Sequence, residues 1–142
     1  ANLCLPQAAL RTLERISARP EDSRSYFVRF MAARALGDSD AEQLALSALL
    51  QRATEAPSQA QRALLLVGDM DAAAELLIER INDPRQRSDA LLELQEMADH
   101  AWPEPGLDWR AGMSALTSRA DVRATLNTNG GRVADYEIFR WN

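Results

Sequence analysis

A chain of 142 residues is long enough to bury a core of its own and short enough to form one domain. Its net charge of −5, from 21 carboxylates and 16 basic residues that are all arginine, argues against a nucleic-acid partner, because phosphates require clustered cations. The one cysteine excludes an internal disulfide, and no apolar run reaches the roughly 18–20 residues of a membrane span.

Alanine and leucine are abundant and β-branched residues are scarce, a composition that favours helices over sheets. The spacing of apolar residues and helix breakers predicts an all-α chain of about eight helices. They lie near residues 6–18, 23–36, 39–56, 57–67, 69–82, 84–100, 108–117 and 118–129. The apolar and aromatic tail 132–142 is expected to dock on the last helices.

Each helix has an apolar stripe that predicts its buried side. The second helix should be the most aromatic, and the fifth and eighth should be anchored by aliphatic side chains. The expected core residues of these three helices are Tyr26, Phe27, Phe30, Met31, Ala33, Ala73, Leu76, Leu77, Ile81, Val122 and Leu126.

Two Gly-Asp-x-Asp motifs begin at Gly37 and Gly68, 31 residues apart, and predict the same turn between helices. Glycine is typical of a helix end where the chain turns left-handed, and a short polar residue caps the next helix. In the first motif, Ser39 and Glu42 have the spacing of a capping box, with Ser39 as the cap.

Three other helix features follow from local residue types. Asp83 is expected to cap the sixth helix with Pro84 as its first residue, and Ser118 is expected to open the eighth with Asp121 at the reciprocal capping position. Glu93 is expected on the water-facing side of the sixth helix.

Helix pairs of about 31–34 residues with this turn resemble tetratricopeptide repeats. The matching turn residues are Gly37, Asp38 and Asp40 in the first copy and Gly68, Asp69, Asp71 and Ala73 in the second. The resemblance implies a right-handed superhelix of helical hairpins within a single domain 1–142. Residues 1–22 would supply an N-terminal helix, 23–100 two repeats, and 107–142 a C-terminal cap and tail. An irregular helical bundle is the alternative.

The resemblance implies a non-catalytic protein-interaction or scaffold module that binds a peptide or protein partner in a helical groove. Because Trp and Arg are favoured interface anchors, the candidate partner-binding residues are Arg29, Arg34, Trp102, Trp109, Arg110, Tyr136 and Trp141. The alternative is a regulatory or dimerisation domain attached to an enzyme or sensor, and a homodimer is left open. A small all-α enzyme is the third interpretation.

No catalytic residue, metal site or cofactor is expected, and no insertion into a membrane. His100, the one histidine, has Glu96 one helical turn before it, but tight zinc sites use more His or Cys ligands. The arginine-only basic residues and the absence of an initial Met suggest a piece of a longer bacterial protein. The compartment is left open, with the cytoplasm favoured because no signal peptide is visible.

Overall fold

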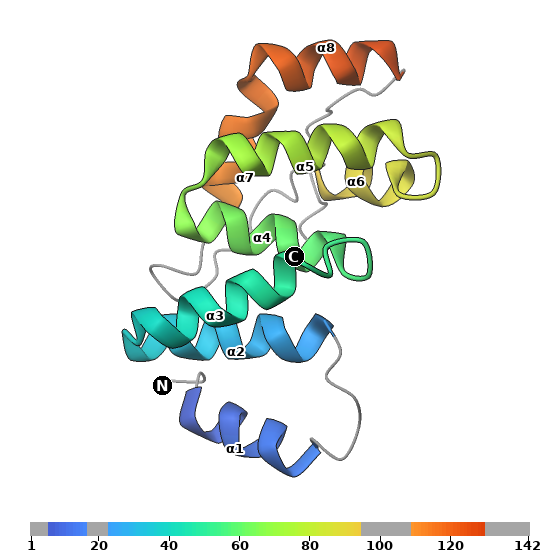
Figure 1. The fold of residues 1–142 in the computed structure, drawn as a ribbon. Coiled ribbons are helices and arrows are strands. Elements are labelled where there is room, and N and C mark those ends of the chain that lie inside the picture. Colours follow the sequence, from blue (N-terminus) through green and yellow to red (C-terminus); the bar gives the residue numbers. More distant parts are fainter. Residues whose placement is uncertain (1–5, 17–22, 95–108, 130–142) are drawn as a thin grey trace, which may run out of the picture. The chain divides into compact units, whose positions relative to one another are not determined.

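The computed structural model describes residues 6–16, 23–94 and 109–129, which form eight helices and contain no strand (Figure 1). The all-α class predicted from the composition is confirmed for this part of the chain. The predicted bounds of α2 and α4 agree to the residue. The helices are α1 (Pro6–Ile16), α2 (Ser23–Leu36), α3 (Ser39–Leu50), α4 (Pro57–Val67), α5 (Met70–Asn82), α6 (Arg87–Glu93), α7 (Arg110–Ser118) and α8 (Ala120–Thr128).

The helices gather in two compact units, an N-terminal unit of residues 1–63 and a C-terminal unit of residues 64–142. The boundary between them falls inside α4. In the N-terminal unit α2 packs along α3, and α1 packs against α2 (Figure 1). In the C-terminal unit α5 is the central helix, because it contacts α6, α7 and α8. The single domain over 1–142 stays a prediction.

The turn between α2 and α3 ends one helix and caps the next within two residues. Gly37 has φ +71°, a left-handed conformation that favours glycine, and the Asp38 amide donates back to the Ala33 carbonyl at 3.0 Å. The Asp38 side chain then accepts a hydrogen bond from the Ala41 amide at 3.0 Å. Asp38 is therefore the cap of α3, and the expectation that Ser39 caps it is wrong, because Ser39 is already the first residue of the helix.

The turn between α4 and α5 repeats this arrangement. Gly68 has φ +80°, and the Asp69 amide donates to the Leu64 carbonyl at 3.1 Å. The Asp69 side chain accepts from the Ala72 amide at 3.1 Å. The two motifs therefore build the same turn, as their shared sequence predicts.

The start of α6 differs from the prediction. Asp83 follows the last residue of α5, and residues 84–86 form a turn before α6 begins at Arg87. The turn is held by Asp83 itself, whose side chain accepts from the Arg85 amide at 2.9 Å and whose carbonyl accepts from the Gln86 amide at 3.1 Å. Pro84 is thus a turn residue and not the first residue of the helix.

The start of α8 also differs. Ser118 is the last residue of α7, and the residue preceding α8 is Arg119, which provides no side-chain cap. The Asp121 carboxylate accepts from Arg119 at 2.9 Å, and Arg119 reaches Asp71 at 2.7 Å as well. Because this arginine engages Asp121, the expected reciprocal cap from Ser118 is wrong.

The cores of the two units have different compositions. Apart from Phe30 and Leu49, the buried apolar residues described in the N-terminal unit are alanines. The C-terminal unit buries larger aliphatic side chains, and α7 approaches α4 so closely that a Cβ on Gly112 would lie 3.0 Å from Leu65 Cδ2. The predicted stripes are confirmed at the following buried positions: Phe30, Ala33, Ala73, Leu77, Ile81, Val122 and Leu126. The remaining expected core residues are only half-buried: Tyr26, Phe27, Met31 and Leu76.

A buried ion pair links α5 to α6. Arg80 is 1% exposed, and its two terminal nitrogens donate to the two Glu93 oxygens at 3.0 Å each. A buried guanidinium requires a carboxylate, and this paired geometry is the strong form of that contact. Glu93 is 16% exposed, so the expectation that it faces water is wrong.

Candidate functional site

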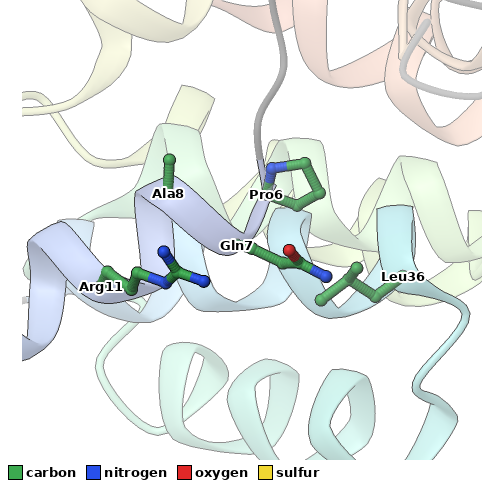
Figure 2. A pocket seen from close by; sticks show the side chains of 5 residues that line it. All are labelled: Pro6, Gln7, Ala8, Arg11 and Leu36. Atoms are coloured by element: carbon green, nitrogen blue, oxygen red, sulfur yellow. The ribbon is translucent and has the colours of Figure 1, made fainter.

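An open hollow lies between the first turns of α1 and the end of α2, within the N-terminal unit (Figure 2). Its volume of about 390 Å³ is near the lower end of the range of small-ligand sites, which is about 300–1,000 Å³. It is lined by three apolar and two polar residues: Pro6, Ala8, Leu36, Gln7 and Arg11. Helix α1 therefore supplies most of the lining and α2 supplies one aliphatic side chain.

The polar part of the hollow comes from one face of α1. Gln7 and Arg11 are four residues apart, so they are neighbours on the helix surface. Figure 2 shows the Arg11 side chain extending along α1 toward Gln7, and the Gln7 amide pointing toward Leu36. The hollow thus presents a guanidinium and an amide beside an aliphatic side chain.

The apolar part of the hollow centres on Leu36, the last residue of α2. Its side chain is 45% exposed because Gly37 ends the helix immediately after it and turns the chain into α3. Pro6 and Ala8 line the same hollow. A partly exposed leucine in an apolar recess gains free energy when another apolar side chain covers it.

The chemistry of the lining suits binding. None of the five lining residues is a histidine, cysteine, serine or carboxylic acid, so the lining offers no usual nucleophile or general base. In the part of the chain that the structure describes, no three His, Cys, Asp or Glu side chains gather as a metal site would require.

Two of the predicted partner-binding residues lie on α2, but neither lines the hollow. Arg34 donates to Glu42 on α3 at 2.7 Å, and this ion pair ties the two helices together. Arg29 is half-buried on the same helix. The arginine at the hollow is Arg11, which sequence reasoning missed. Its spacing of four residues from Gln7 on α1 is the sequence feature that could have indicated it.

The other five predicted residues fall in the C-terminal unit. Trp109 precedes α7 and packs against the apolar core, so the structure gives it a packing role. Arg110 is the first residue of α7, and its side chain is outside the description. Trp102, Tyr136 and Trp141 lie outside the described residues.

Within the described residues, every helix is too short or too polar to cross a membrane.

No family model matches this chain, and no curated protein or solved structure matches it either. The resemblance to tetratricopeptide repeats therefore stays a prediction. The function has to be inferred from the residues of the hollow and from the surfaces of the two units.

Proposed function

We propose that this chain is a non-catalytic protein-interaction module, and that its N-terminal unit binds a peptide segment of a partner in the hollow between α1 and α2. The observation that carries this proposal is the exposed Leu36 in a recess shared with Pro6, Ala8 and two polar side chains. A recess that combines apolar surface with a few polar groups is the usual form of a ligand site.

The architecture that we propose for residues 23–100 is a pair of tetratricopeptide-like hairpins in a right-handed superhelix. The support is the pair of matching turns at Gly37–Asp38 and Gly68–Asp69, 31 residues apart. A crystal structure would test the proposal by showing whether α2–α3 and α4–α5 superimpose as equivalent hairpins.

The hollow can be tested with a phage-displayed library of random peptides panned on the full chain. We expect wild-type protein to enrich a peptide family and Leu36→Asp to abolish the enrichment, because a carboxylate in the recess removes its apolar surface. Leu44→Asp is the matched control, because Leu44 lies on α3 outside the hollow and is 74% exposed. If no peptide is enriched, or if both variants behave alike, the hollow is not the binding site.

Self-association is the second candidate function, and the exposure of Leu44 favours it. Leu44 stands among exposed polar residues of α3, namely Asp40, Gln43 and Ser47, so it offers less apolar surface than the hollow. Light scattering over a concentration series tests this alternative. If wild type forms a dimer and Leu44→Asp does not, self-association becomes the favoured function. If wild type is a monomer at every concentration measured, self-association is excluded over that concentration range.

A further inference from the structure

We infer that the hollow recognises an acidic side chain beside an aliphatic one, so that the partner segment places an Asp or Glu carboxylate on Arg11 and an aliphatic side chain on Leu36. This inference rests on the proposed function, because it names the chemistry of the peptide that the hollow would bind. In this inference, Arg11 is the residue that determines the specificity for an acidic peptide.

Arg11 is exposed on α1, and no carboxylate among the described residues pairs with it. Three other arginines of the chain already have internal carboxylate partners: Arg34 pairs with Glu42, Arg80 with Glu93, and Arg119 with Asp71 and Asp121. The guanidinium of Arg11 can therefore donate to an external carboxylate without breaking a described ion pair.

Gln7 adds a second donor at the same place. Its amide has two N–H donors and makes no hydrogen bond to a described residue, and it lies between Arg11 and Leu36 in the close view (Figure 2). A carboxylate accepts several hydrogen bonds at once, and guanidinium–carboxylate contacts are among the strongest of these. The sequence of a guanidinium, an amide and an aliphatic side chain along the hollow matches an acidic residue next to an apolar one.

The net charge of the N-terminal unit does not oppose an anionic segment. Residues 1–63 contain eight arginines and seven carboxylates, whereas residues 64–142 contain eight arginines and fourteen carboxylates. An acidic peptide therefore meets a nearly neutral N-terminal unit and a strongly negative C-terminal one. A single arginine beside a leucine is too little positive charge for a nucleic acid, which requires clustered cations.

The test compares the peptide families enriched from the random library by wild type, Arg11→Gln and Arg24→Gln. Arg24 is the matched control, because it is an exposed arginine of the same unit outside the hollow. Circular dichroism checks that each variant keeps its helices. Enriched peptides are resynthesised with an amidated C-terminus, with Asp/Glu replaced by Asn/Gln, and their affinity is measured by fluorescence anisotropy at low and high salt.

We expect wild type and Arg24→Gln to enrich peptides with an aliphatic residue next to Asp or Glu, and Arg11→Gln to lose the acidic preference. Affinity for an acidic peptide should fall about fivefold in Arg11→Gln, the scale of one exposed ion pair. The same peptide should bind wild type more weakly at high salt, because salt screens exposed charges.

Three results would overturn the inference. Enrichment without an acidic preference, or an acidic preference that survives in Arg11→Gln, would refute the role of Arg11 and leave the proposed function standing. Loss of binding on C-terminal amidation would show that the hollow binds the C-terminal carboxylate of a peptide instead of an acidic side chain. Failure to enrich any peptide would refute the proposed function and the inference together.

Discussion

The same Gly-Asp turn precedes α3 in the N-terminal unit and α5 in the C-terminal unit, yet the two units bury different side chains. The N-terminal unit relies on alanines with Phe30 and Leu49, whereas the C-terminal unit buries leucine, isoleucine, valine and methionine. Small side chains bring helices close together but bury little apolar area for each residue. The stability of the N-terminal unit should therefore depend on very few large residues, and that of the C-terminal unit should be spread over many.

The polar contacts of the two units also differ. In the N-terminal unit the buried Ser23 hydroxyl donates to Glu55 at 2.8 Å, and the Arg52 guanidinium lies 5.0 Å from the centre of the Tyr26 ring. In the C-terminal unit the Arg80–Glu93 pair is buried. A shared turn motif thus determines where the helices end, and the side chains between the turns determine how each unit is held together.

The largest expected effect is that of Phe30→Ala. Phe30 is fully buried, so the substitution should destabilise the N-terminal unit by about 4 kcal/mol through lost burial and the cavity left behind. Hydrogen exchange should show faster exchange in α2 and α3 than in α5 and α8. Leu44→Ala is the control. Equal loss of protection in both units would mean that they unfold as one.

Glu93→Ala tests the buried pair of the C-terminal unit. Removing the carboxylate leaves the Arg80 charge buried, which should cost about 3 kcal/mol in the free energy of unfolding. Urea unfolding followed by circular dichroism measures this cost. Glu79→Ala removes an exposed carboxylate on α5 and should change the stability little. If the two variants unfold alike, the pair contributes nothing specific.

Gly37→Ala and Gly68→Ala test whether the two turns are equivalent. No atom within 4 Å would obstruct a Cβ at either position, so the expected cost comes from the positive φ alone, about 1 kcal/mol for each variant. Chemical unfolding of both variants provides the comparison. A marked difference between them would show that the surroundings, and not the turn, determine the cost.

The smallest expected effect is that of Arg119→Gln. Hydrogen bonds from Arg119 and then from the Val122 amide hold the pKa of Asp121 below its ordinary value of 3.8. Because the pKa is lower in the folded state, the stabilisation is present above pH 3.8 and is lost as the pH falls through the folded value. This stabilisation is fully present at neutral pH, but the Tm difference from wild type should be small there because the contact is exposed.

That Tm difference should shrink further in acid, because Asp121 becomes protonated, and at high salt, because the exposed contact is screened. Thermal unfolding of wild type and Arg119→Gln at neutral and acid pH measures it, with Arg123→Gln as the control on α8. A difference that persists below the folded pKa would show that Arg119 stabilises α8 by packing.

Local residue types were sufficient to predict much of the helical framework. The predicted bounds of α2 and α4 are correct because Gly37 and Gly68 end these helices by their own backbone preferences and Pro57 suits a first turn. The buried stripes of α5 and α8 are correct because helical periodicity places their apolar residues on one face. The error at Ser39 arose because the Asp38 side chain, one residue earlier, caps the helix, and the error at Pro84 arose because Asp83 holds a turn ahead of the helix.

Only the tertiary structure decided which polar groups meet. Glu93 is buried because Arg80, on another helix, requires a carboxylate, and Arg119 reaches Asp71 across 48 residues of sequence. The hollow likewise depends on Arg11 and Leu36, which come from helices packed together in one unit. The sequence determined helix ends and buried faces because those depend on neighbours within a turn or two. Side-chain partners and the hollow depend on which helices pack together, and no local pattern specifies that.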